Sequence, residues 1–315
     1  MSNNKTKILV TGGAGYLGSL LVPSLLNLGY SVNVLDNLIY NQAPLLDCCS
    51  NENFNFIKGD ITDYTLVDSL IKKNDVIIPL AAIVGAPASD ANKSLANLVN
   101  YEAYKYLVEK LSKSQKILFP TTNSGYGIGA KDSFCDEKSP LNPISIYGKN
   151  KVEIEKLFLD KVNAVTFRLA TVFGMSPRMR TDLLVNDFVL KAIKDRSIVI
   201  FEENFRRNFI HIRDVIYSFI FGIDHYDKMA GEPFNVGLSS ANISKKQLAE
   251  KIQKHLPSTY IHFAQIGEDP DKRDYIVSND KIESLGWTTK FNLDDGIKEL
   301  IKGYKIISTN SFTNV

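Results

Sequence analysis

Two side chains capable of proton transfer lie four positions apart in the segment YGKNK at residues 147–151. The surrounding pattern predicts a helix over residues 146–161, and residues at this spacing share one face of a helix. An isolated tyrosine is a poor base at neutral pH because its pKa lies near 10. A neighbouring ammonium group favours the phenolate and lowers that pKa. We therefore predict that Tyr147 is a general base and that Lys151 tunes it.

A second pair with the same spacing, Tyr101 and Lys105, shows that spacing alone does not identify a site. Tyr147 begins the helix that follows a predicted strand ending at Thr122. Ligands of parallel sheets lie beyond such strand ends. Tyr101 falls in the middle of a helix predicted over residues 95–111. Their positions therefore favour a catalytic role for Tyr147, whereas Tyr101 is expected to lie on the surface of its helix.

A glycine-rich turn connects an apolar run, residues 8–10, to a helix-patterned segment near the start of the chain. Gly12 permits the tight turn, Gly15 lets backbone N–H groups approach a diphosphate, and Gly18 lets helix and strand pack closely. The start of the following helix is a site for anions. A flexible surface turn is the alternative for such glycines, and the flanking strand and helix favour dinucleotide binding.

The next predicted strand, residues 32–35, ends in an acid, Asp36. A carboxylate at this position can accept hydrogen bonds from the hydroxyls of a ribose. Asn37 and Leu38 follow it, and no arginine or lysine stands nearby to neutralise a 2′-phosphate. We therefore expect NAD rather than NADP.

Two further strand ends fit the same cofactor. Asp60 and Ile61 follow the third strand and suit an adenine pocket, although Asp60 could equally cap the helix that follows, and both roles can hold. Ala81 and Ala82 follow a continuous apolar run over residues 75–80. Their small side chains would let a cofactor lie against the backbone.

Strands alternate with helices five times before residue 120, which predicts a right-handed parallel sheet with helices on both faces, an α/β doubly wound fold. We expect residues 1–174 to form the dinucleotide-binding domain. Residues 175–315 should form mainly a substrate-binding region, with a segment of about 209–237 returning to the first domain. The second region contains a cluster of bases that would suit a diphosphate, although a solvated face is the alternative for each one singly. They are Arg178, Arg180, Arg206 and Arg207.

Composition argues against several classes of protein. The 315-residue chain has 44% hydrophobic and 23% charged residues, as ordinary globular proteins do. Its net charge of +2 and lack of a basic run argue against nucleic-acid binding. The longest apolar run, residues 76–84, is too short to span a membrane, and the polar N-terminus predicts no signal peptide, so we expect a cytoplasmic protein. The four histidines lack metal-ligand spacing with cysteine or carboxylate, so we expect no metal site.

Together these motifs resemble an extended short-chain dehydrogenase/reductase of the nucleotide-sugar epimerase and dehydratase family. The resemblance covers nearly the whole chain and implies a Rossmann-type sheet with a smaller C-terminal substrate-binding α/β region. The motifs that carry it are TGGAGYLG at 11–18, Asp36, Asp60-Ile61, Asn100, the strand end at Thr122, YGKNK at 147–151, FNVG at 234–237 and KRDY at 272–275.

The resemblance implies roles for single residues. In that family the tyrosine takes the proton from a sugar hydroxyl while hydride passes from the same carbon, usually C4, to NAD. Tyr147 would be the base, Lys151 would hold the ribose and tune the tyrosine, and Thr122 would hydrogen-bond the reacting oxygen. The implied cofactor-binding residues are Gly12, Gly15, Tyr16, Leu17, Gly18, Asp36, Asn37, Asp60, Ile61, Ala81, Ala82, Asn100, Tyr147 and Lys151. The implied substrate-binding residues are Thr122, Asn123, Ser124, Arg178, Arg180, Arg207 and Arg273. The resemblance also implies a homodimer through the helices that bear Asn100 and Tyr147.

One departure from the family pattern bears on the reaction. The 4,6-dehydratases of the family follow the threonine with Asp-Glu or Ser-Glu, which eliminate water across C5 and C6. Here the positions hold Asn123 and Ser124, and neither can serve as a carboxylate acid or base. We therefore expect the reaction to stop at a 4-keto sugar, or to return hydride as a 4-epimerase does.

Within the family, the strand end TTNSGYG and the whole-chain pattern look like the GDP-D-glycero-α-D-manno-heptose 4-dehydrogenases of bacterial capsule pathways. That resemblance implies oxidation of C4 on a GDP-linked heptose. A nucleotide-sugar 4-epimerase is the alternative enzyme and would use the same residues. A dinucleotide-sensing protein without catalysis is the alternative from another class, and it would have no need of Tyr147 and Lys151.

Overall fold

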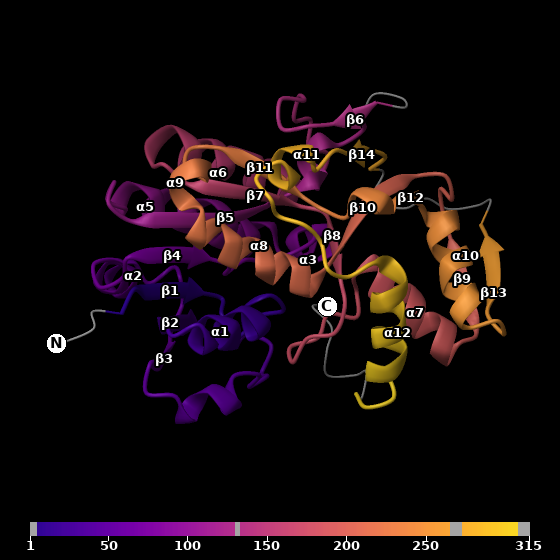
Figure 1. The fold of residues 1–315 in the computed structure, drawn as a ribbon, viewed down its shortest axis with the longest axis horizontal. Coiled ribbons are helices and arrows are strands. Elements are labelled where there is room, and N and C mark those ends of the chain that lie inside the picture. Colours follow the sequence, from indigo (N-terminus) through magenta and orange to yellow (C-terminus); the bar gives the residue numbers. More distant parts are fainter. Residues whose placement is uncertain (1–4, 130–132, 265–272, 308–315) are drawn as a thin grey trace.

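The computed structural model describes residues 5–129, 133–264 and 273–307, and its largest element is a seven-stranded sheet (Figure 1). All strand pairs in this sheet are parallel, and the order across it is β11-β7-β5-β4-β1-β2-β3. β4 and β7 are buried along their whole length, as expected for strands inside a parallel sheet that is covered on both faces. The strands are β1 (Lys7–Thr11), β2 (Ser31–Asp36), β3 (Phe54–Lys58), β4 (Val76–Pro79), β5 (Lys116–Thr122), β7 (Val165–Leu169) and β11 (Pro233–Val236).

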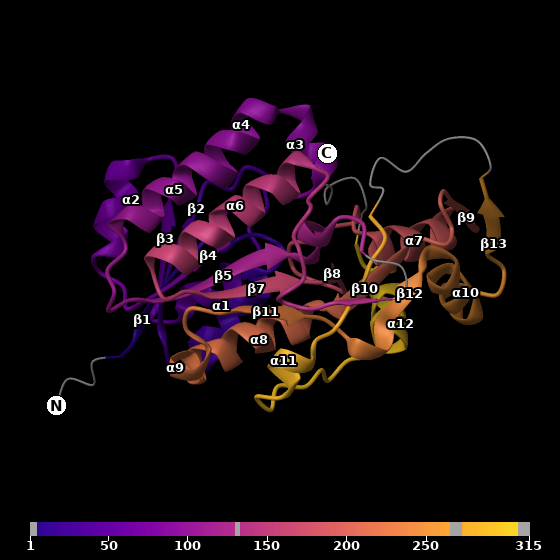
Figure 2. The same ribbon diagram turned by 90° about the horizontal axis from the view of Figure 1, so that it is seen from above.

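Helices cover both faces of this sheet (Figure 2). α1 (Gly18–Asn27), α8 (Ile212–Asp224) and α9 (Tyr226–Met229) lie on one face. α2 (Tyr64–Ile71), α5 (Ala103–Lys110) and α6 (Ile146–Lys161) lie on the other. Each layer buries its own apolar core against the sheet. The predicted α/β doubly wound, Rossmann-type fold is confirmed. None of the helices formed by the described residues is long and apolar enough to cross a membrane.

The long helix predicted over residues 95–111 is interrupted. It consists of α4 (Lys93–Asn97), a π-helical turn η2 (Leu98–Glu102) and α5. A short helix that the sequence did not predict, α3 (Ala86–Ala91), precedes it. The π turn carries Asn100, whose side chain accepts from the backbone N–H of Ile83 at 2.9 Å and donates to its carbonyl at 2.8 Å. The interruption therefore brings an amide side chain against the chain segment that follows β4.

A second, smaller core lies beside the carboxyl ends of the main sheet. It is enclosed by α7 (Leu184–Lys194), α10 (Lys245–His255) and α12 (Leu293–Gly303). β8 (Thr171–Phe173) leaves the line of β7 and pairs with β10 (Arg206–His211), which also pairs with β12 (Asn242–Ser244). Two parallel pairs complete this part: β9 (Ser197–Ile200) with β13 (Tyr260–Phe263), and β6 (Phe134–Cys135) with β14 (Ile276–Val277). The remaining turns and short helices are η1 (Leu46–Ser50), η3 (Asn123–Tyr126), η4 (Ser239–Ala241) and α11 (Asp280–Glu283).

A buried ion pair fixes α6 to the sheet. Glu155 of α6 accepts from Arg168 Nε of β7 at 2.9 Å, and their side chains are 2% and 6% exposed. The same carboxylate accepts from the hydroxyls of Thr121 at 3.2 Å and Thr166 at 3.1 Å. Each partner of this pair is thus compensated only because the other is present.

We expect Arg168→Met to lower the free energy of unfolding by about 3–5 kcal/mol, because it leaves the Glu155 carboxylate buried without its cation. Urea unfolding followed by circular dichroism measures the loss. Lys191→Met removes an exposed ion pair with Asp187 and should cost under about 1 kcal/mol. The double variant Arg168→Met/Glu155→Gln should regain part of the loss, since no unpaired charge remains. An Arg168→Met protein as stable as the wild type would contradict this role.

Candidate active site

A cavity of about 340 Å³ lies beyond the carboxyl ends of the parallel strands, a volume in the range of small-molecule sites. It runs from the glycine turn after β1, past Asp36 and Asp60 at the ends of β2 and β3, to Tyr147 and Lys151 on α6. The strand order reverses between β1 and β4, and open α/β sheets bind ligands at such a point. Most residues predicted from the sequence therefore face one cavity.

The glycine turn forms a cradle at one end of the cavity. Gly12 has a φ of +69°, and a Cβ there would lie 2.6 Å from the Cα of Ala81. A Cβ on Gly18 would lie 2.4 Å from the carbonyl oxygen of Gly13. A Cβ on Gly15 would meet, among the described residues beyond its chain neighbours, only the Gly12 carbonyl oxygen, at 3.0 Å. Two glycines thus allow close backbone packing, and Gly15 leaves room that fits the diphosphate of a dinucleotide.

Asp36 organises the backbone around that cradle. Its carboxylate accepts from the backbone N–H of Ala14 at 2.9 Å and of Leu38 at 2.8 Å. Burial raises the pKa of Asp36, and these two hydrogen bonds oppose the rise. Asp36 and its neighbour Asn37 both line the cavity, as expected for residues beside a ribose.

The structure tests one of the two roles considered for Asp60, that of a helix cap. The helix α2 is capped by Asp63, whose side chain accepts from the backbone N–H of Leu66 at 3.0 Å. The helix-cap role of Asp60 was therefore wrong. Asp60 lines the cavity with Ile61 and accepts from Asn37 Nδ2 at 2.7 Å. Burial acts to raise the pKa of Asp60, but its hydrogen bonds hold that pKa below the usual value.

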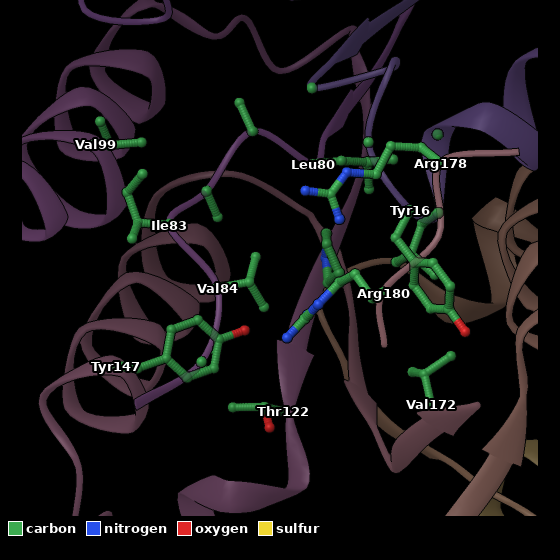
Figure 3. A pocket seen from close by; sticks show the side chains of 18 of the residues that line it. Tyr16, Leu80, Ile83, Val84, Val99, Thr122, Tyr147, Val172, Arg178 and Arg180 are labelled. Carbon is green, nitrogen blue, oxygen red and sulfur yellow. The ribbon is translucent and has the colours of Figure 1, made fainter. Parts of the chain in front are cut away.

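Tyr147 lies in the first turn of α6, where Ser145 caps the helix with a 3.1 Å bond from the backbone N–H three residues later. Figure 3 shows its hydroxyl pointing into the cavity, with the guanidinium of Arg180 extending toward it. Burial raises the pKa of Tyr147, and the positive charges of Arg180 and Arg273 oppose that rise. The sequence predicted a cation beside this phenol in Lys151, and the structure adds these two arginines from other parts of the chain.

Lys151 lies one turn further along α6 and is 3% exposed. Its ammonium nitrogen donates to the carbonyl of Pro120 at 3.1 Å and lies 4.6 Å from the centroid of the Phe119 ring. Burial lowers the pKa of Lys151 to about 7. A negative charge formed at Tyr147 would favour the ammonium form again. The protonation states of the two side chains are therefore linked.

The end of β5 presents two hydroxyls to the cavity. Thr122 Oγ1 and Ser124 Oγ lie 2.7 Å apart, and both residues line the cavity. The backbone N–H of Thr122 donates to Thr121 Oγ1 at 2.6 Å, and Thr121 Oγ1 donates in turn to Glu155. Asn123, between the two hydroxyls, is fully buried and does not line the cavity. The end of β5 is thus connected through Thr121 to Glu155, which belongs to the buried ion pair between α6 and β7.

The predicted arginines separate into two groups. Arg178, Arg180 and Arg273 line the cavity. Arg180 is paired with Asp182, which accepts from its Nε at 3.2 Å. Arg207 does not line the cavity. It is 2% exposed, and its guanidinium carbon lies 5.8 Å from the centroid of the Tyr275 ring, which does line it. Arg207 therefore supports the wall of the cavity.

The remaining predicted cofactor-binding residues do not all line the cavity. Asn100 does not line the cavity, and it holds the backbone of Ile83, which does. Tyr16 lines the cavity with Leu17, but its hydroxyl points away and donates to the carbonyl of Gly174 at 2.7 Å (Figure 3). Ala81 and Ala82 both line the cavity. The rejected pair is separate: neither Tyr101 nor Lys105 borders the cavity.

Sequence reasoning missed several residues of the cavity wall. Tyr40 lies between β2 and η1, outside the motifs named from the sequence, and its ring faces Arg178. Tyr275 belongs to the KRDY motif, which could have pointed to it. Thr121 begins the strand end TTNSGYG, but the sequence reasoning gave it no role. Tyr40 had no sequence signal, because only the folded chain brings it to a residue so far along the sequence.

A family model described as the NAD dependent epimerase/dehydratase family matches residues 8–237. The chain belongs to this family. The resemblance stated from the sequence motifs is confirmed at this level.

Individual relatives agree with the assignment. The dTDP-D-glucose 4,6-dehydratase of Mus musculus is 27% identical over 321 residues, which cover 95% of this chain and 88% of the relative. The UDP-glucose 4-epimerase of Lactobacillus helveticus is 28% identical over 338 residues, which cover 95% and 97%. The crystal structure of UDP-glucuronic acid 4-epimerase from Bacillus cereus, in complex with UDP-glucuronic acid and NAD, matches with a TM-score of 0.85 at 26% identity and covers 95% of this chain and 99% of that chain.

NAD is the cofactor of this family, and the chain is an NAD-dependent member of it. The glycine cradle and the carboxylate of Asp36 fit the diphosphate and ribose of that dinucleotide. Within residues 5–129, 133–264 and 273–307, no group of three or more His, Cys, Asp or Glu side chains is arranged to hold a metal ion.

We expect Gly15→Ala to weaken NAD binding about tenfold or more, because a methyl group there occupies the space in which a diphosphate approaches the backbone. Isothermal titration with NAD measures the change. The contrasting variant Gly18→Ala should instead lower the midpoint of thermal unfolding, since its Cβ collides with the backbone of Gly13. NAD affinity unchanged in Gly15→Ala would show that the dinucleotide does not approach this turn.

Proposed function

We propose that this chain catalyses the NAD-dependent oxidation of the C4 hydroxyl of a nucleotide-linked sugar to a 4-keto sugar. The observation that carries the proposal is the position of the Tyr147 hydroxyl, which points into the same cavity as the glycine cradle. A lysine one turn away and two hydroxyls at the end of β5 complete the arrangement. A protein that only sensed a dinucleotide would need none of these groups.

Different residues contribute to the removal of two hydrogens from one carbinol. Tyr147, as phenolate, accepts the proton of the sugar hydroxyl. Thr122 positions the reacting oxygen by a hydrogen bond. Lys151 supplies the positive charge that balances the phenolate and reaches toward the ribose of the cofactor. NAD, when bound, accepts the hydrogen and electron pair from the same carbon, so the alcohol is oxidised and the cofactor reduced.

The described residues of the cavity include no acid and base placed at the sugar to catalyse the elimination of water. Asp36 and Asp60 are the only carboxylates that line the described part of the cavity, and both lie at its adenosine end. The strand end offers the hydroxyls of Thr122 and Ser124 instead. Removing a proton beside the keto group and protonating a departing hydroxyl requires an acid and a base at the sugar. The absence of these groups favours a product from which no water has been eliminated.

The charges of the cavity suit a nucleotide-linked substrate. Arg180, whose guanidinium extends toward the hydroxyl of Tyr147, and Arg273 both place positive charge near this phenol. A diphosphate bound by these arginines would place its sugar near the phenol. Relatives named as acting on dTDP-glucose, UDP-glucose and UDP-glucuronic acid support this substrate class. We favour a GDP-linked substrate, GDP-D-glycero-α-D-manno-heptose, on the resemblance of the strand end TTNSGYG and the whole-chain pattern.

A 4-epimerase is the second candidate, because it uses the same residues and several relatives bear that name. The two are separated by incubating the protein with NAD and GDP-heptose, or with the UDP- and dTDP-linked hexoses, and resolving the products by chromatography. A 4-keto sugar that accumulates with reduced cofactor supports the dehydrogenase. An epimeric pair without net reduction of cofactor supports the epimerase and overturns the first proposal.

We also propose the wider organisation expected from the sequence. Residues 1–174 would form the cofactor domain and residues 175–315 mainly the substrate region. The segment 209–237 would return to the cofactor domain, in keeping with the place of β11 at the edge of the main sheet. A homodimer through the helices that bear Asn100 and Tyr147, and a cytoplasmic location, stay predictions.

We expect Tyr147→Phe to lower kcat by at least about 100-fold, because it removes the proton acceptor and leaves the cavity otherwise intact. Formation of reduced cofactor, followed by absorbance, measures the rate, and titration should show nearly unchanged NAD affinity. Tyr101→Phe alters the other tyrosine–lysine pair, outside the cavity, and should leave the rate unchanged. Equal activity of Tyr147→Phe and wild type would remove the proposed base.

We expect Arg180→Met to move the rise of kcat/KM with pH toward higher pH. A positive charge near the phenol favours the phenolate, so removing it raises the pKa of Tyr147 and reduces the active fraction at neutral pH. The deficit should therefore shrink as the pH is raised. Arg213→Met, which removes an arginine paired with Glu299 outside the cavity, is the control. A deficit that is the same at every pH would limit Arg180 to substrate binding.

A further inference from the structure

Two loops from distant parts of the chain meet at the rim of the cofactor groove. The guanidinium carbon of Arg178 lies 4.0 Å from the centroid of the Tyr40 ring. Tyr40 belongs to the segment after β2, and Arg178 to the segment between β8 and α7. Both line the cavity, and Arg178 is 1% exposed. We propose that Tyr40 and Arg178 form a clasp across this groove that sets how fast the dinucleotide leaves.

The position of the clasp follows from the residues beside it. Tyr40 lies four residues after Asp36, at the ribose end of the groove. The backbone N–H of Arg178 donates to Ser19 Oγ at 3.4 Å, and Ser19 lies in the first turn of α1, next to the glycine cradle. The positive charge of Arg178 also opposes the rise that burial causes in the pKa of Asp36. The stacked pair therefore joins the ribose end of the groove to its diphosphate end.

One side of the clasp is anchored to the glycine turn. Ser176 Oγ donates to the carbonyl of Tyr16 at 2.7 Å and lies 2.7 Å from Ser19 Oγ. The hydroxyl of Tyr16 donates to the carbonyl of Gly174 at 2.7 Å. Several hydrogen bonds thus hold the segment that carries Arg178 against the start of α1. This segment is the fixed side of the clasp.

The other side carries backbone strain. Leu38 and Asn41, which flank Tyr40 closely in the chain, have φ values of +56° and +51°. Asparagine tolerates the left-handed region, whereas leucine is sterically strained there. The segment stays in this conformation while its tyrosine is held by Arg178, and loss of the stack lets it relax. The segment that carries Tyr40 is therefore the side that opens.

The clasp changes the role of Arg178. The sequence assigned this arginine to the substrate diphosphate, but its contacts lie beside the cofactor's own ribose and diphosphate positions. A guanidinium stacked on an aromatic ring in a desolvated site makes a substantial cation–π contact. The clasp acts on the cofactor alone, so it does not depend on which sugar is oxidised, and its test needs no sugar.

The test measures the release of reduced cofactor. The protein is loaded with NADH, mixed with excess NAD in a stopped-flow instrument, and followed by NADH fluorescence. Tyr40→Ala should raise the dissociation rate constant about tenfold, whereas Tyr40→Phe, which keeps the ring, should stay within about twofold of the wild type. Tyr217→Ala is the matched control, since it removes a similar stack with Lys290 at 4.4 Å outside the cavity. It should leave release unchanged.

A double-mutant cycle tests whether the two residues act together. Arg178→Met should also speed release, and adding Tyr40→Ala to it should speed release no further. The clasp would be overturned if the effects of the two substitutions on the NADH dissociation rate constant multiplied in the double variant. It would also be overturned if Tyr40→Ala unfolded at the wild-type temperature and released NADH at the wild-type rate. If Tyr40→Ala fails to fold, Tyr40→Leu removes the ring while filling its space, and the same two outcomes apply.

Discussion

The carboxylate of Glu155 is the contact on which the geometry of the active site depends. It lies on the same face of α6 as Lys151 and Tyr147, at spacings of four and eight residues, and is almost fully buried. One oxygen accepts from Arg168 on β7 and the other from Thr121 on β5. Because a buried carboxylate must keep both partners, α6 cannot slide or rotate over the sheet without losing them. These contacts therefore fix the position of the Tyr147 phenol relative to the end of β5.

Burial and neighbouring charges determine the protonation states of Tyr147 and Lys151. Burial opposes charge on both Tyr147 and Lys151, raising one pKa and lowering the other. Burial therefore favours the neutral phenol of Tyr147 and the neutral amine of Lys151. The positive charges of Arg180 and Arg273 oppose this effect at Tyr147 and favour its phenolate. A site that binds an anionic substrate by these same arginines would thus connect substrate binding to the readiness of its base.

The sequence predicted what depends on local pattern. The parallel strands follow apolar runs, and α6 begins after Ser145 and ends at Lys161 as its periodicity indicates. The glycine cradle and Asp36 were predictable because a diphosphate and a ribose require those residue types at those positions. Features made by tertiary contact were not predictable. β8 departs from the main sheet to pair with β10, and Arg178 meets Tyr40, because of how distant segments pack.

Acquiring the elimination reaction of the dehydratases would take more than one acidic substitution. Asn123 is fully buried, does not line the cavity, and has no hydrogen-bond partner for its amide among the described residues. An aspartate there would be a buried carboxylate without a cation, and it would point away from the sugar. Ser124 lines the cavity but is 2% exposed and hydrogen-bonded to Thr122, so a glutamate would remove this contact between two hydroxyls. The packing of η3 therefore opposes a simple change of either residue to an acid.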